Sequence, residues 1–139
     1  MRLTGWGALW LAALAGCGAY VEDPACWENA GGTFTFPAVN PGVPASLYVA
    51  IANRCDRPVE VIRVTLSALR CEGDCPAVTL ASTPELPVRI SPGGALTLVL
   101  QATATGMAGH AEALLVATTG EADAPENQVW TVVAETAAR

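Results

Sequence analysis

Residues 95–105 read Ala-Leu-Thr-Leu-Val-Leu-Gln-Ala-Thr-Ala-Thr, and they show the cleanest alternation of apolar and polar side chains in the chain. The leucines at 96, 98 and 100 fall on one side of an extended backbone, because successive side chains of a strand point to opposite faces. Thr97, Gln101 and Thr103 fall on the other side. This period of two predicts a half-buried β-strand whose leucines face a core.

Around this strand the chain breaks into short apolar runs that are separated by turn residues. Ser91-Pro92-Gly93-Gly94 precedes it, and Pro92 and Gly93 suit the central positions of a type II turn. The other runs that we predict as strands are 33–37, 45–53, 59–69, 77–81, 87–90, 111–118 and 129–134. No long segment has helical periodicity, so the sequence predicts an all-β sandwich or barrel.

The run 59–69 changes phase along its length. Val59 and Val61 alternate in one phase, whereas Ile62, Val64 and Leu66 alternate in the other. An extra residue in a strand produces such a shift, so we expect a β-bulge near positions 61–62.

Several short motifs occur in a characteristic order: Phe36-Pro37-x-Val39-x-Pro41-Gly42, the strand end Ile51-Ala52-Asn53, Pro58-Val59-x-Val61, and Ser91-Pro92-Gly93 before the leucine strand. In this order they resemble the immunoglobulin-like domains of the ASPM–SPD-2–Hydin type, which are related to the major sperm protein fold. The resemblance implies an immunoglobulin-like antiparallel β-sandwich of about seven to eight strands over residues 32–139. Members are mostly interaction and scaffold modules without shared catalytic residues, so it implies a non-enzymatic protein.

The start of the chain differs from the rest, because it is an apolar segment with almost no charged residues. Arg2 is the only charge before Glu22, and an apolar segment ends at Leu14-Ala15-Gly16-Cys17. These four residues resemble the processing box of bacterial lipoproteins, in which a leader is removed and the cysteine receives acyl chains such as palmitate. We therefore expect residues 1–16 to be a signal peptide, Cys17 to be lipidated, and residues 17–31 to be the anchored cysteine and a tether.

Two alternatives for this leader are open. A transmembrane helix is disfavoured, because the run reaches only about the lower length limit of a span and contains several glycines. The second alternative is that the leader is cleaved but Cys17 remains an ordinary, unmodified residue. Lipidation predicts a location in the cell envelope, anchored to a membrane. Gly18 is compatible with the outer membrane under the sorting rule of proteobacterial lipoproteins.

Length and charge bound the rest of the chain. Removal of the 16-residue leader from the 139 residues leaves 123, enough for one domain with its own core. Loss of Arg2 changes the net charge from −6 to −7, and the chain contains no lysine. A dispersed acidic surface argues against nucleic acid as a partner. We expect a membrane contact through the lipid and a protein partner.

Four further cysteines, at positions 26, 55, 71 and 75, follow the export signal, and an even number suggests two disulfides. Their spacing lacks the paired C-x2-C knuckles of zinc sites. In the topology that the resemblance implies, a strand 33–37 antiparallel to strand 45–53 would bring Cys26 near Cys55. Cys71 would then lie about 30 Å from Cys55 at strand rise. We therefore expect the bridges Cys26–Cys55 and Cys71–Cys75.

Residues with catalytic or metal-binding chemistry are few. His110 is the chain's one histidine, and no nearby motif frames it as the base of a Ser-His-Asp arrangement. With Glu112 it is expected to form a solvated edge pair. The alternative is that Met107 and His110 bind copper, as in a periplasmic copper carrier, since both are suitable ligand types. We otherwise expect no cofactor.

The remaining candidates have structural interpretations. Cys71 to Cys75 is expected to be a tight polar loop, in which Glu72 and Asp74 offer too few oxygens for calcium by themselves. Trp27 is expected to cap the core beside the first disulfide, or alternatively to mark a contact surface. Residues 120–128 are expected to be an acidic loop.

Overall fold

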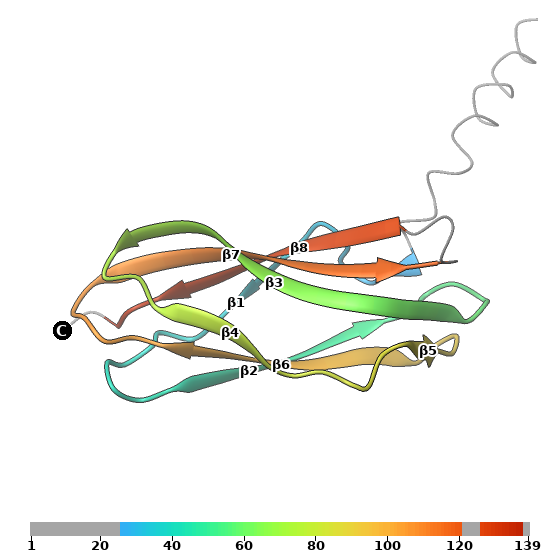
Figure 1. Cartoon of the computed structure of the whole chain (residues 1–139), viewed down its shortest axis with the longest axis horizontal. Coiled ribbons are helices and arrows are strands. Elements are labelled where there is room, and N and C mark those ends of the chain that lie inside the picture. The colour runs from blue at the N-terminus through green and yellow to red at the C-terminus, as the bar shows by residue number, and fades with distance from the viewer. Residues whose placement is uncertain (1–25, 121–125, 138–139) are drawn as a thin grey trace, which may run out of the picture.

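The computed structural model describes residues 26–120 and 126–137 as two packed β-sheets (Figure 1). The expected leader over residues 1–16, the expected lipidation site Cys17 and residues 121–125 lie outside the described residues. The strands are β1 (Thr33–Thr35), β2 (Ala45–Ala52), β3 (Val59–Gly73), β4 (Ala77–Ser82), β5 (Val88–Ile90), β6 (Ala95–Thr103), β7 (Gly109–Thr119) and β8 (Glu126–Glu135).

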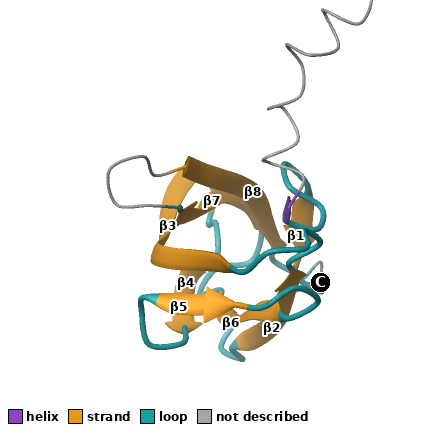
Figure 2. Ribbon diagram, turned by 90° about the vertical axis from the view of Figure 1, so that its right-hand side faces the viewer, coloured by secondary structure: helices purple, strands orange, loops and turns teal. Residues whose placement is uncertain are grey.

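One sheet has the order β1-β8-β7-β3-β5 and the other the order β2-β6-β4. Figure 2 shows the two layers end on, with β7 and β8 in one and β2 and β6 in the other. The predicted all-β sandwich is therefore confirmed. Among residues 26–120 and 126–137, no helix is long and apolar enough to cross a membrane.

The core lies between the sheets and follows the alternation of the sequence. Leu96, Leu98 and Leu100 of β6 are fully buried, as predicted, and Thr97 between them is exposed. Val49 and Ile51 of β2 pack beside them, since β2 and β6 are antiparallel with Ile51 opposite Leu96. The opposite sheet contributes buried residues from β7 and β8, chiefly Ala113, Leu115, Ala117, Trp130, Val132 and Ala134.

The long strand β3 contains the predicted irregularity. Its register with β7 shifts between Val61 and Arg63, which confirms the bulge expected near 61–62. A second shift, between Ala68 and Arg70, was not predicted. β3 also continues to Gly73, so the expected loop 71–75 is wrong in its first half: residues 71–73 pair with β7. The extended strand spans about 50 Å.

The predicted pairing of strand 33–37 with strand 45–53 is wrong. β1 instead runs parallel to β8, with Phe34 opposite Val132. The segment that does lie beside β2 comes earlier, because Trp27 forms an antiparallel bridge with Asn53. Cys26 and Trp27, which we expected in the tether, are consequently buried in the core.

Candidate functional site

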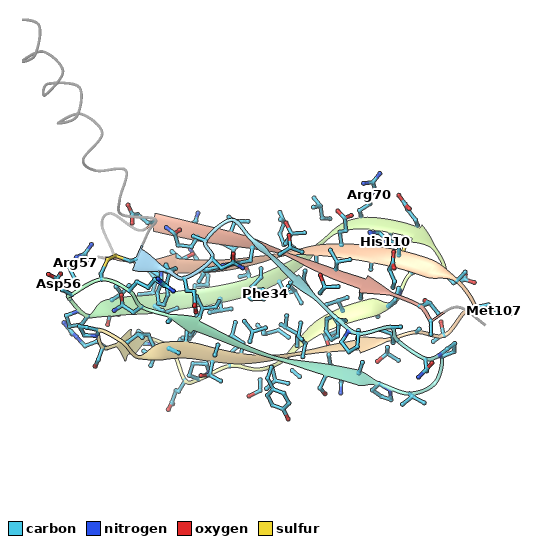
Figure 3. The ribbon with its side chains drawn as sticks, turned by 180° about the vertical axis from the view of Figure 1, so that it is seen from behind. Phe34, Asp56, Arg57, Arg70, Met107 and His110 are labelled. Carbon is cyan, nitrogen blue, oxygen red and sulfur yellow. A yellow bond between two sulfur atoms is a disulfide. The ribbon has the colours of Figure 1, made fainter. Side chains whose placement is uncertain are left out.

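The two ends of the sandwich carry different groups (Figure 3). Asp56 and Arg57 lie at one end, close to the Cys26–Cys55 disulfide, and we call it the basal end. Met107 lies at the opposite end, which we call the distal end. The second disulfide belongs to the distal end, because the N–H of Asp74 donates to the carbonyl oxygen of Ala108 at 2.9 Å.

At the basal end, Cys26 and Cys55 form a disulfide with their Cα atoms 4.8 Å apart. The expected pair is correct, although the strand pairing from which it was inferred is not. The N–H of Glu28 donates to the carbonyl oxygen of Ala52, and the N–H of Arg54 donates to that of Cys26. These two bonds align the cysteines across a short antiparallel ladder.

Trp27 is buried beside this disulfide, so its expected role in capping the core is confirmed. The neighbouring Asn53 is buried and its side chain is fully engaged. Its amide nitrogen donates to the carbonyl oxygens of Arg57 at 2.9 Å and Ile90 at 3.0 Å, and its side-chain oxygen accepts from the N–H of Cys55 at 3.0 Å. The basal end is therefore held together by the Cys26–Cys55 disulfide and by the hydrogen bonds of the Asn53 side chain.

A hollow of about 260 Å³ opens at the basal end beside Trp27. Its charged lining mixes both signs: Arg57 and Arg89 with Glu60 and Glu126. Such a lining selects neither anions nor cations. Glu126 was expected in an acidic loop but begins β8, whereas Glu121 and Asp123 lie outside the described residues.

At the distal end, Cys71 and Cys75 form the second expected disulfide, with their Cα atoms 5.4 Å apart. The carboxylate of Glu72 forms an exposed ion pair with Arg70, at 2.9 Å between Nε and Oε2. This pairing compensates the charge that Glu72 would offer to calcium. Among residues 26–120 and 126–137, no group of three metal-ligating side chains of the His, Cys, Asp and Glu types is assembled.

His110 is held between two carboxylates. Its Nε2 lies 2.9 Å from Oε2 of Glu112 on the same strand, and its Nδ1 lies 2.9 Å from Oε2 of Glu135 on β8. The hydrogen bond to Glu112, and then that to Glu135, raise the pKa of His110 above its usual 6.5. Only the charged imidazolium can donate from both nitrogens, so this geometry favours the protonated side chain.

The expected pairing of His110 with Glu112 is confirmed, but the expected edge position is wrong, because β7 lies between β8 and β3. Glu135 was not predicted as a partner of His110. Its position opposite His110 depends on the register between β7 and β8, and this register cannot be inferred from the sequence. Met107 is 67% exposed. A copper ion at His110 would have to displace a carboxylate from a ring nitrogen, because both nitrogens are engaged.

No family model matches this sequence, and no curated protein matches it. Among solved structures, the chain is similar to the ASH/PapD-like domain 7 of human CEP192, with a TM-score of 0.54 and 12% identity over 82% of this chain and 87% of that one. It is also similar to part of the VesB protease of Vibrio cholerae, with a TM-score of 0.59 and 10% identity over 85% of this chain and 34% of that one.

The similarity to the CEP192 domain agrees with the immunoglobulin-like β-sandwich that the motif order implied. At such identities the two similarities establish the fold alone. The chain spans about a third of the VesB protease, so the protease's activity says nothing about the residues described here.

Proposed function

We propose that this protein is a lipid-anchored, non-enzymatic interaction module of a bacterial cell envelope. The processing box that ends at Cys17 supports the anchor. The order of motifs supports the interaction role, since the immunoglobulin-like domains that it resembles are mostly interaction and scaffold modules, and the sandwich has the fold that this resemblance implies.

The processing box carries this proposal, and the orientation of the domain follows from the position of Cys26. This cysteine belongs to the basal end and lies nine positions after Cys17. Nine residues reach at most about 30 Å when extended, so a lipid on Cys17 would keep the basal end near the bilayer. The distal end, with Met107 and the Cys71–Cys75 disulfide, would then face away from it.

The surroundings of His110 support a non-enzymatic role. A general base needs a free ring nitrogen aimed at a nucleophile. Both ring nitrogens of His110 contact carboxylates instead. Within the described residues, no Ser or Cys side chain hydrogen-bonds to this imidazole.

Metabolic labelling with radioactive palmitate, combined with membrane fractionation, tests the anchor. The full chain expressed in a bacterial host should acquire label and sediment with membranes, and Cys17→Ser should carry no label. Gly18→Ala, which keeps the acceptor thiol, is the matched control and should be labelled. Equal labelling of Cys17→Ser, or none in the unmodified chain, would contradict the proposal.

Copper titration of the purified chain tests the alternative function as a copper carrier. Submicromolar binding that His110→Ala abolishes and Met107→Leu weakens would favour the carrier. We expect no such binding, because both ring nitrogens of His110 already contact the carboxylates of Glu112 and Glu135.

A further inference from the structure

The outer edge of β2 has no hydrogen-bonding partner over most of its length. β2 lies at the edge of the sheet β2-β6-β4. The N–H of Asn53 donates toward β6, to Gly94, whereas the carbonyl of Ala52 points outward and accepts from Glu28. Backbone groups alternate in direction along an antiparallel strand. The N–H and C=O groups of Ser46, Tyr48 and Ala50 therefore point away from β6, and no described residue bonds to them.

This edge also lacks the features by which natural proteins block strand addition. Ala45–Ala52 contains no charge, proline, glycine or bulge. The opposite edge of the same sheet differs, since β4 has a register shift between Leu80 and Ser82. In the other sheet, both edge strands are only three residues long. β2 is thus the long, regular, uncharged edge of the described sandwich.

Two side-chain features mark the same edge. Tyr48, at its centre, is 77% exposed, the highest value among the exposed large apolar side chains of the described residues. Beside the edge, a hollow of about 420 Å³ is lined by Phe34, Ala50 and Ile51 together with the polar residues Glu28 and Asn29. An added strand would place alternate side chains toward this hollow and the others beside Tyr48.

We propose that β2 pairs with β2 of a second copy of this chain, antiparallel and about a two-fold axis at Tyr48. In this register Tyr48 lies opposite Tyr48 of the other copy, and Ser46 lies opposite Ala50. Each of these residues directs both backbone groups outward, so each pair exchanges two hydrogen bonds. A two-fold interface requires a self-complementary patch, and this uncharged, evenly spaced edge is one.

The proposed pairing of two β2 strands depends on the proposed lipid anchor for its affinity, but the register of the pairing does not depend on the anchor. One strand pair buries less than the roughly 1,200 Å² typical of stable interfaces, so pairing is weak in dilute solution. Tethers on one membrane would raise the effective concentration and populate it.

Cysteine cross-linking of the full chain in membranes tests the register. Under mild oxidation, Tyr48→Cys should form a disulfide-linked dimer, because facing Cα atoms lie about 5.5 Å apart. Thr97→Cys is the matched control: it is exposed on the same sheet face but one strand inward, at least about 14 Å from its counterpart. Dimers through Thr97→Cys, or through Thr79→Cys on β4, would overturn the proposal.

A charge-reversal experiment excludes other occupants. Tyr48→Lys should remove the dimer, because two lysines would face each other, and Tyr48→Glu should do the same. Co-expression of the two variants should restore the dimer, whereas Thr97→Lys should leave it unchanged. Cross-linking of Tyr48→Cys to a different protein, or no recovery in the mixed pair, would show that the occupant is not a second copy.

A dilution series in detergent separates this inference from the anchor. If Cys17 carries no lipid, concentrated Tyr48→Cys chain should still cross-link, and the anchor alone would be wrong. If the lipid is present but Tyr48→Cys remains monomeric at every concentration and in membranes, the edge pairing is wrong.

Discussion

The side-chain amide of Asn53 donates to the carbonyl oxygen of Ile90 at 3.0 Å, although 37 positions separate the two residues. Asn53 directly follows β2, and Ile90 ends β5 in the opposite sheet. One buried polar side chain therefore connects the two sheets at the basal end.

Replacement of this side chain should destabilise the fold. Asn53→Ala leaves the carbonyls of Arg57 and Ile90 and the N–H of Cys55 without their partner in a buried region. We expect a loss of about 3 kcal/mol in the free energy of unfolding, measured by urea denaturation. Asn40→Ala, an exposed control, should change it by about 0.5 kcal/mol or less. Equal effects of the two variants would contradict the role of Asn53.

The two disulfides should contribute unequally to stability. Cys26–Cys55 closes a loop of 29 positions and Cys71–Cys75 one of only 4. By loop entropy, the double variant Cys26→Ala/Cys55→Ala should lose about 3.5 kcal/mol and Cys71→Ala/Cys75→Ala about 2 kcal/mol. Burial of Cys26 increases the difference, because its removal also affects the core. The reverse order of unfolding midpoints would be inconsistent with this structure.

The close contact between two distal loops predicts a contrast between two glycines. A Cβ atom at Gly109 would overlap the backbone of Asp74, whereas one at Gly106 would overlap the Asp74 side chain from its Cβ to its carboxylate, and only the carboxylate can rotate away. We expect Gly109→Ala to cost about 3 kcal/mol and Gly106→Ala about 1 to 2 kcal/mol, measured by thermal unfolding. If both substitutions were neutral, the loops would not be packed as described.

The paired carboxylates make a prediction about pH. The pKa of His110 is raised in the folded chain, so its interactions stabilise the fold fully below pH 6.5 and are lost as the pH rises through the folded-state pKa. Because the chain has one histidine, a single NMR titration of the imidazole reports this value, which should exceed 6.5.

Removal of each carboxylate tests the cause of that shift. Glu112→Gln should lower the pKa of His110 more than Glu135→Gln, since the bond to Glu112 is the larger contribution. The stability difference between the unmodified chain and His110→Gln should shrink as the pH rises. An unshifted titration would mean that the two hydrogen bonds do not persist in solution.

Local alternation was enough to predict the strands, their buried faces and the bulge in β3. Leu96, Leu98 and Leu100 illustrate this, because a period of two already states which side chains share a face. The motif ending in Asn53 also indicated the fold. The sequence did not reveal that Asn53 reaches Ile90, because that contact depends on how the sheets stack.

Pairings between distant strands were the part that the sequence could not supply. The parallel partnership of β1 with β8 and the contact of His110 with Glu135 both depend on long-range register. Register is set by the whole packed core rather than by either strand alone. The Cys26–Cys55 prediction was correct because the chain before β1, rather than β1 itself, lies beside β2.

Intact-mass spectrometry of the protein isolated from membranes is the decisive experiment for lipidation at Cys17. We expect a polypeptide of 123 residues, from Cys17 to Arg139, with added mass from acyl chains on its first residue. A chain that still begins at Met1, or one that begins at Cys17 without any lipid mass, would contradict it.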